Sequence, residues 1–566
     1  MSARITRWRW RRDATWTLLA AALVGCTSAE GEAADLVFRG GTVWTGVADG
    51  PRAQALAVRD GRILVVGSDA DVEEVAGPET RVVELGGRAL LPGFIDAHTH
   101  FIDGGFKLAG VDLRDAATPE EFARRIGAYA ATVPAGTWVT GGDWDHELWG
   151  GELPRREWVD SLTPEHPVFV NRLDGHMALA NTAAMRAAGI DAGDERTADP
   201  AGGAIVRDPA TGEAAGVFKD EAMALVGAVI PEPSEAELDG ALQAAARHAL
   251  GRGVTQVHDM AGWQSLETYR RAHARGALPL RVYSVVPIAT WERMRDYVAE
   301  NGRGDDRLWW GGLKGFVDGS LGSTTAWFYD PYDDEPSTSG LMTTDSAELR
   351  GWIEGADAAG LHVMVHAIGD AANDWLLDVY ADVAAANGSR DRRFRIEHAQ
   401  HLGRGALARF AEQGVIASMQ PYHAADDGRW AEKRIGAERV RTTYAFRSLL
   451  DRGARLAFGS DWTVAPIDPV LGIDAAVTRR TIDGANPDGW VPQERLTLEE
   501  TLRAYTQGAA YAGFAEDRVG RLEPGMLADL VVVSEDPFSM EPNELVGLRV
   551  DMTVVEGRIA FEHSGG

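Results

Sequence analysis

The feature that most constrains the fold is an alternation of strand-like and helix-like segments through the middle of the chain. Eight short apolar segments recur between helical stretches, and in chain order they are FIDAHTH, VTQVHD, RVYSVVP, GGLKGFVDG, LHVMVHAIGD, FRIEHAQ, VIASMQPYH and RLAFGSDW. Strands that alternate with helices form parallel sheets, because a crossover helix makes each parallel connection. Eight such units predict an α/β chain folded as a distorted (β/α)8 barrel, the TIM barrel.

The helical stretches carry start and stop signals. Ser234 and Glu237 form a capping box that opens the alanine-rich helix EAELDGALQAAARHAL, and Gly251 ends it. The stretch SAELRGWIEGADAAG likewise ends at Gly360. Both helices fall between predicted strands, as a barrel requires.

Two parts of the chain do not fit the barrel pattern. Residues 101–233 separate the first strand from the Ser234 helix, which is too long for an ordinary connection, so we expect an inserted lid or substrate subdomain. Strand-like segments at both ends, residues 35–92 and 516–562, predict a small β-sandwich-like domain assembled from the two termini. The barrel itself is expected within residues 93–515.

The amino-terminal segment predicts export. Five arginines within residues 4–12 precede the apolar stretch Trp16–Val24, and Leu23-Val24-Gly25-Cys26 resembles a bacterial lipobox. We expect residues 1–25 to be a signal peptide, Cys26 to be lipidated and residues 26–34 to be a tether. The protein would then be a lipoprotein facing the periplasm or cell exterior. The alternatives are an ordinary signal peptide with a chance cysteine, and a twin-arginine export signal.

Charge and cysteine content exclude several functions. The chain has 85 acidic against 56 basic residues, a net charge of −29, which disfavours a nucleic-acid partner. Its single cysteine leaves no intrachain disulfide and no cysteine-based metal or nucleophilic site in the mature domain. A small-molecule substrate and membrane contact through a lipid anchor only are expected, while a homo-oligomer is left open.

Chemically active side chains fall at the ends of the predicted strands. They are His98 and His100 on the first strand, Lys314 in the fourth, His366 on the fifth, His398 on the sixth and Asp461 on the eighth. The carboxyl ends of barrel strands converge on one face, which is the usual catalytic face. Two histidines spaced two residues apart on a strand project to the same side and can chelate one ion. A single histidine such as His366 or His398, taken alone, is more often a hydrogen-bonded structural residue.

Lys314 needs a separate explanation, because an ammonium group cannot bind a cation. A desolvated lysine loses its proton, and its amine can add carbon dioxide to give a carbamate that bridges two metal ions. The alternative is an ion pair between Lys314 and Asp318.

Several motifs in the same order resemble a known superfamily. They are GFIDAHTH, LKGFVDGSLGSTTA, VHAIGDAAND, RIEHAQ, FGSDW, LTLEETLRAYTQGAAYA and VGRLEPGMLADLVVV. Together they resemble the metal-dependent amidohydrolase superfamily, and more narrowly its amidohydrolase 3 branch, which includes N-substituted formamide deformylases. GGDWDHELW and RLDGHMALAN in the insertion match that branch too. The resemblance spans nearly all of the mature chain.

The resemblance implies a role for each strand-end residue. The histidine pair of the first strand would hold the more buried of two divalent ions, with zinc as the expected metal. His366 and His398 would hold the more exposed ion, and carboxylated Lys314 would bridge the two. Asp461 would contact the metal site and shuttle a proton. His362 is expected to be a packing or supporting residue.

Substrate contacts are expected from the insertion and from the seventh strand. Trp144, Asp145, Arg172, Asp174 and His176 lie in the family-like motifs of the insertion and would form a lid and pocket, with Arg172 able to bind a carboxylate or carbonyl. Equally, Arg172 and Asp174 would hold the insertion together. His401 lies outside the ligand pattern, as does His423, which either contacts substrate or lies on the surface.

The function expected is hydrolysis of a non-peptide carbon–nitrogen bond by a metal-bound hydroxide, with Asp461 as the proton shuttle. The alternatives are a mononuclear deaminase, a hydrolase of another bond in the same superfamily, and a non-catalytic binding protein on this scaffold. Lys314 discriminates against the deaminase, because mononuclear deaminase sites of this superfamily do not use a carboxylated lysine.

Overall fold

The computed structural model describes residues 33–47, 50, 52–191, 193 and 198–563. The predicted signal peptide and Cys26 lie outside these residues. Within the described part, no helix combines the length and the apolar character needed to cross a membrane.

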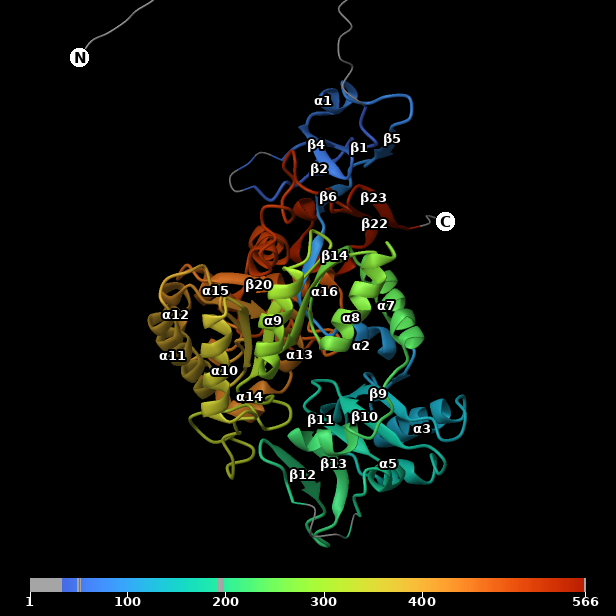
Figure 1. Cartoon of the computed structure of the whole chain (residues 1–566), viewed down its shortest axis with the longest axis vertical. Helices are drawn as coiled ribbons and strands as arrows, with labels where there is room; N and C mark the ends of the chain where they lie inside the picture. Colours follow the sequence, from blue (N-terminus) through green and yellow to red (C-terminus); the bar gives the residue numbers. More distant parts are fainter. Residues whose placement is uncertain (1–32, 48–49, 51, 192, 194–197, 564–566) are drawn as a thin grey trace, which may run out of the picture.

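Eight parallel strands form the centre of the molecule (Figure 1). They are β7 (Phe94–Thr99), β14 (Val254–Met260), β15 (Arg281–Pro287), β16 (Leu308–Phe316), β17 (His362–Ala367), β18 (Arg395–His398), β19 (Ile416–Met419) and β20 (Arg455–Phe458). Each strand pairs with the next in chain order, and a parallel bridge from Thr99 to Trp462 brings the last strand end beside the first. The predicted barrel and all eight of its strands are confirmed.

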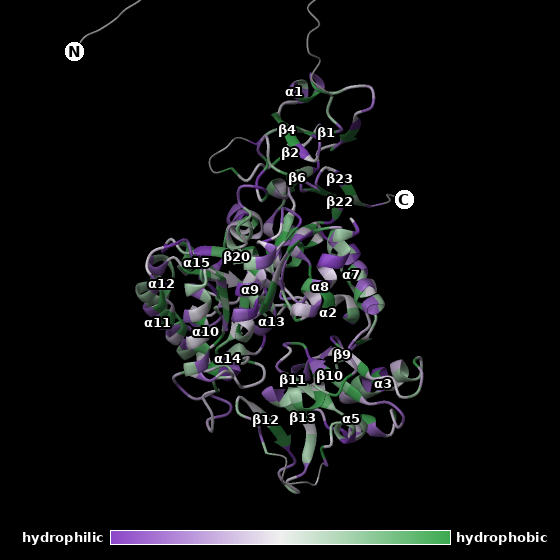
Figure 2. Ribbon diagram, viewed as in Figure 1, coloured by the Kyte–Doolittle hydropathy of each residue, from purple (hydrophilic) through white to green (hydrophobic). Residues whose placement is uncertain are grey.

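Helices surround the barrel strands (Figure 1). They are α7 (Glu235–Leu250), α8 (Trp263–Ala274), α9 (Trp291–Asn301), α10 (Ser346–Ala358), α11 (Asp370–Asn387), α12 (Ala406–Gln413), α15 (Phe446–Leu450) and α16 (Pro469–Thr478). The capping box of Ser234 and Glu237 opens α7 as predicted, and Gly251 caps its end. Figure 2 shows both hydrophilic and hydrophobic residues on α7, as expected of a helix that buries one face.

The insertion forms a second sheet beyond one end of the barrel (Figure 1). Its strands, in spatial order, are β12 (Gly203–Arg207), β13 (Ala214–Asp220), β11 (Met177–Ala180), β10 (Val168–Arg172), β9 (Val139–Trp144) and β8 (Val111–Asp112). Helix α2 (Phe101–Lys107) leads from β7 into this sheet and packs against α7. Helix α3 (Pro119–Ala130) buries Phe122 and Ile126 in the same small core.

Two smaller sheets lie at the opposite end of the molecule, near both chain ends (Figure 1). One contains β4 (Arg62–Gly67), β3 (Ala55–Arg59), β1 (Leu36–Arg39) and β5 (Arg81–Glu84). The other contains β2 (Thr42–Val43), β6 (Ala89–Pro92), β21 (Leu530–Val533), β22 (Val550–Val555) and β23 (Arg558–Glu562), so it combines strands from both ends of the chain. Asp60 and Gly61, both with positive φ, make the tight turn between β3 and β4.

Candidate metal centre and substrate pocket

A pocket of about 340 Å³ opens where the carboxyl ends of the barrel strands face the insertion. Five of the six predicted strand-end residues line it, and they are His100, Lys314, His366, His398 and Asp461. The sixth, His98, is fully buried directly behind them. The folded chain therefore brings together all six residues, which span more than 360 positions of the sequence.

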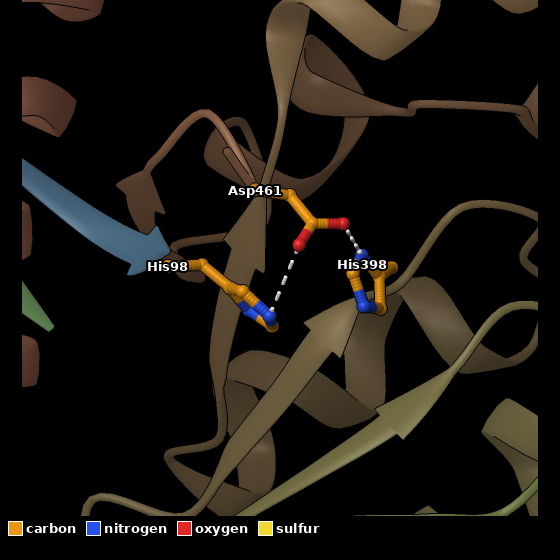
Figure 3. Close-up of side chains that lie close together, drawn as sticks. All are labelled: His98, His398 and Asp461. Carbon is orange, nitrogen blue, oxygen red and sulfur yellow. Dashed lines mark ion pairs between the residues drawn. The ribbon is translucent and has the colours of Figure 1, made fainter. Parts of the chain in front are cut away.

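Asp461 lies at the centre of this cluster. One carboxylate oxygen, Oδ1, is 3.5 Å from His98 Nε2 and 3.3 Å from His100 Nε2. The other oxygen is 3.9 Å from His398 Nδ1 (Figure 3). The rings of His366 and His398 are 4.5 Å apart, which completes a group of four imidazoles and one carboxylate.

The strand geometry differs slightly from the expectation for the histidine pair. Strand β7 ends at Thr99, and His100 is the first residue after it, where helix α2 begins. Both imidazoles still reach Asp461, because the bridge between Thr99 and Trp462 holds the ends of the two segments side by side.

Lys314 projects from β16 into the same cluster. Its Nζ atom lies 3.2 Å from His98 Nε2, and burial lowers the pKa of its ammonium group to about 8. The alternative partner, Asp318, accepts hydrogen bonds from the backbone N–H groups of Ile368, Gly369 and Trp327 instead. Lys314 is therefore not held in the ion pair with Asp318 that was the alternative explanation.

The donor set fits divalent metal ions. His98, His398 and Asp461 each offer one ligand atom, and these three atoms lie within 4.8 Å of one another. Asp461 Oδ1 is buried and makes no hydrogen bond with any described residue, although buried polar atoms normally have a partner. Burial lowers the pKa of His98 to about 4 and those of His366 and His398 well below their ordinary value. Neutral imidazoles and a carboxylate are ligands that suit zinc and related ions.

A buried charged chain supports the centre from inside the barrel. Glu397 accepts a hydrogen bond from His98 Nδ1 at 2.6 Å, which leaves Nε2 facing the cluster. Arg395 donates to both carboxylate oxygens of Glu397, at 2.7 and 3.0 Å, and also contacts His258 Nδ1 at 3.0 Å. None of the Arg395, Glu397 and His98 side chains is exposed.

The sequence analysis missed Glu397, although a signal was present. Arg395 and Glu397 stand two residues apart in a buried strand, and this spacing places both side chains on one face. Buried charges are normally paired, so this pattern predicts an internal ion pair. It does not identify His98, which lies 299 residues away, as a third member.

The backbone at two site residues adopts an unusual conformation. His398 and Asp461 have φ values of +74° and +57°, and Ala399, after His398, has +45°. Such left-handed conformations are costly for residues other than glycine and tend to be retained at functional sites. They turn the side chains of His398 and Asp461 toward one another at the ends of β18 and β20.

The insertion contributes Arg172, Asp174 and His176 to the pocket wall. Arg172 is almost fully buried, and its Nη1 atom donates to Asp174 at 2.7 Å. His176 Nδ1 is 2.6 Å from Asp220, and its ring lies 5.1 Å from that of His366. The ion pair with Asp174 ties Arg172 to a neighbouring residue of the insertion.

Two of the predicted substrate contacts are not supported. Trp144 is fully buried in the core of the insertion, where its indole N–H donates to the carbonyl oxygen of Val170. Asp145 contacts Arg172 and Arg429 and does not line the pocket. Both belong to the framework of the lid because their partners lie within the protein.

Three further histidines, His423, His362 and His401, lie in different surroundings. His423 lines the pocket on helix α13 (Pro421–Asp427), and its Nε2 atom is buried without a hydrogen-bond partner among the described residues. It is therefore in the pocket wall and not on the surface. His362 bonds to Tyr283 Oη and to the Arg393 carbonyl oxygen, as expected of a packing residue. His401 packs against Phe328, outside the pocket.

Comparison with known proteins agrees with this geometry. The profile of the amidohydrolase family matches residues 81–561. Protein LONG AFTER FAR-RED 3 of Arabidopsis thaliana is 42% identical over 95% of this chain and 93% of its own length. An N-substituted formamide deformylase of Arthrobacter pascens is 30% identical over 94% of this chain and 99% of its own. The crystal structure of an uncharacterized metal-dependent hydrolase from Pyrococcus horikoshii superimposes with a TM-score of 0.72 at 28% identity, covering 90% of this chain and 99% of that one.

Proposed function

Because the chain belongs to the amidohydrolase family of metal-dependent hydrolases, we propose that it cleaves a non-peptide carbon–nitrogen bond of the amide type. The observation that carries this proposal is the placement of the buried Asp461 carboxylate among four imidazoles and Lys314. The name of the Arthrobacter relative, a formamide deformylase, supports an amide as the scissile group.

The residues divide into two sets of metal ligands. His98 and His100 would hold the more buried ion and His366 and His398 the more exposed one, and a carbamate formed on Lys314 would serve both as a shared ligand. Zinc is the metal that we expect. When bound, such ions polarise a carbonyl group and acidify water. The lowered pKa of Lys314 supports the carbamate, because carbon dioxide adds only to the neutral amine.

Asp461 is the group that moves protons. Its Oδ1 atom, which faces His98 and His100, accepts the proton of the attacking water and returns it to the departing nitrogen, which leaves poorly unless it is protonated. His423 offers a buried imidazole nitrogen without a protein partner, and this nitrogen can hold the substrate carbonyl oxygen. The lid formed by the insertion limits access of bulk water to the pocket.

The test replaces Asp461 by asparagine and measures metal content and turnover on a panel of N-acyl amines. We expect Asp461→Asn to retain metal and to lose turnover by about 10²–10⁴-fold, the usual contribution of a general acid–base group. Asp517→Asn, which removes an exposed carboxylate outside the pocket, is the matched control and should leave both quantities unchanged. Undiminished turnover in Asp461→Asn would refute the assignment, and metal-free wild-type protein after gentle purification would refute the proposed function.

We also propose that the mature chain begins at Cys26 and is held to a membrane by a lipid on that residue. The basic and apolar segments before Cys26 support this. Mass spectrometry of the amino-terminal peptide tests it, and an unmodified Cys26 or an intact residue 1 in the mature protein would refute it.

A further inference from the structure

The charges of the pocket wall indicate which class of substrate the pocket accepts. We propose that the pocket accepts amides whose other substituents are uncharged or cationic, that it rejects amides carrying a carboxylate, and that Asp103 is the selecting charge. This inference rests on the proposed amide hydrolysis and deepens it.

Apart from the proposed metal ions, which the hydrolytic reaction occupies, the pocket wall holds no cationic side chain that is free to pair with a substrate carboxylate. Among the described residues that line it, Arg172 and Lys314 are the only lysine or arginine side chains. Arg172 lies between two carboxylates, with Nη1 2.7 Å from Asp174 and Nη2 3.4 Å from Asp145. Lys314 is directed into the metal cluster, 3.2 Å from His98. A bound carboxylate needs a charged or multiple N–H partner to replace its hydration, and this wall offers none that is unpaired.

The histidines of the wall do not change this conclusion. His100, His366 and His398 belong to the metal cluster. His176 is hydrogen-bonded to Asp220 at 2.6 Å, so a positive charge on its ring is already balanced. His423 is left as a neutral hydrogen-bonding group, because burial lowers its pKa.

Asp103 contributes the opposite charge, although desolvation within the pocket raises the pKa of its carboxyl group and the neighbouring His100 imidazole attracts it. It lies on α2, three residues after His100, and its exposed side chain lines the pocket. It makes no hydrogen bond or ion pair with any described residue. By contrast, Asp174 pairs with Arg172, Asp426 pairs with Arg429, and Asp427 accepts hydrogen bonds from Tyr444 and Gln400. A substrate carboxylate would therefore meet a like charge that no arginine or lysine neutralises, which costs binding energy and gives specificity.

Phe316 indicates which kind of uncharged substituent the pocket accepts. It is 37% exposed at the end of β16, where its ring lies 5.3 Å from that of His366. An exposed aromatic ring in a pocket wall next to the metal cluster offers an apolar surface to the substituent of the substrate. The substrates that fit best are amides with an apolar or aryl-alkyl substituent and no carboxylate.

The experiment compares three substrates of matched shape with the metal-loaded enzyme. N-acetyl-L-phenylalanine carries a carboxylate, N-acetyl-L-phenylalaninamide carries a neutral group of similar size, and N-acetyl-2-phenylethylamine carries neither. We expect kcat/KM for the carboxylate to be at least about tenfold below that for the carboxamide, equivalent to 1.4 kcal/mol or more. Equal values for these two substrates would overturn the inference while leaving the proposed function intact.

Binding is measured by calorimetry with the corresponding amines, phenylalanine, phenylalaninamide and 2-phenylethylamine, so that charge selection is tested independently of turnover. We expect phenylalanine to bind more weakly than both other amines. The proposed function alone fails when none of the three amides is hydrolysed but this order of binding holds. Equal or tighter binding of phenylalanine overturns the charge selection.

Three variants test which residue is responsible for the charge selection. Asp103→Asn should reduce the ratio of carboxamide to carboxylate kcat/KM by about threefold or more, because it removes the charge and keeps the shape. Asp517→Asn removes the same charge from an exposed position outside the pocket and should leave the ratio unchanged. Phe316→Ala should raise KM for all three substrates alike. An unchanged ratio in Asp103→Asn would show that Asp103 is not the selecting residue.

Discussion

Replacing Glu397 by glutamine tests whether the charged chain inside the barrel prepares the metal centre. Glu397 accepts from His98 Nδ1 at 2.6 Å, a short distance typical of a charge-assisted hydrogen bond. This bond fixes the tautomer of His98 that leaves Nε2 free for a metal ion. Glutamine has nearly the same shape, but it carries no charge, and its amide group cannot accept through both terminal atoms as the carboxylate does.

Two magnitudes follow from these contacts. Removing a carboxylate that orients a histidine ligand weakens metal binding by about 10–100-fold, or about 1.4–2.7 kcal/mol. Arg395 would also lose the negative partner that it contacts through two hydrogen bonds, at 2.7 and 3.0 Å. Because neither side chain is exposed, breaking this pair is expected to cost about 3–5 kcal/mol of unfolding free energy. Glu397→Gln should therefore lose both stability and metal affinity.

The assay titrates the metal-free variant with zinc in competition with a chelating indicator and follows unfolding in denaturant. Asp357→Asn is the matched control. Asp357 lies on helix α10, outside the barrel interior, and is equally buried, but its partners are Arg390 and Arg392. The control should lose stability and keep its metal affinity. The reasoning is refuted if Glu397→Gln binds zinc as tightly as the wild type, or if both variants lose metal affinity equally.

Three further predictions test the site and the lid. Lys314→Ala should lose metal, measured by elemental analysis, and regain part of its activity with short carboxylic acids that replace the carbamate; full metal content would contradict the bridging role. Because burial lowers the pKa of His98 to about 4, its imidazole stays neutral until the pH falls through that value. His100, the second proposed ligand of the same ion, has a pKa that Asp461 raises despite burial. Metal loss should thus begin as His100 takes up its proton and be complete once the pH falls through about 4, and full metal content below pH 4 would contradict this. In Gly322→Ala the new Cβ atom would meet the guanidinium of Arg172, which should cost about 1–3 kcal/mol of unfolding free energy, whereas Gly351→Ala, where no atom lies within 4 Å, should cost nothing.

The barrel could be predicted from sequence because its signals are local. Each strand is a short apolar run between helical stretches, and features such as the capping box at Ser234 mark where a helix begins. Polar residues at the ends of such runs, such as His366 and Asp461, must meet on one face once the strands are parallel. The fold and the gathering of these side chains on one face could thus be predicted without knowledge of any contact.

The partners of individual side chains could not be predicted from such local signals. Trp144 stands in a motif next to acidic residues, which suggested a pocket, but its indole fills the core between α3 and the insertion sheet. For Arg172 the sequence left open whether it binds a substrate or holds the insertion together with Asp174, and the structure pairs it with Asp174, only two residues later. Whether a charge is available depends on which carboxylate lies beside it in space, and neither charge count nor spacing determines that.

The end of β18 has a backbone geometry that the sequence pattern does not predict. In a regular strand Glu397 and His398 would project to opposite faces, so only one of them could face the barrel axis. Yet Glu397 contacts His98 at 2.6 Å and His398 reaches Asp461, because the positive φ values at His398 and Ala399 break the alternation. One strand end thereby supplies both a proposed ligand, His398, and the support of another, His98. Such conformations cost about 1–3 kcal/mol each and carry no glycine or asparagine signal here. The surrounding contacts must offset that cost, so the site is formed by the whole barrel and not by the motif alone.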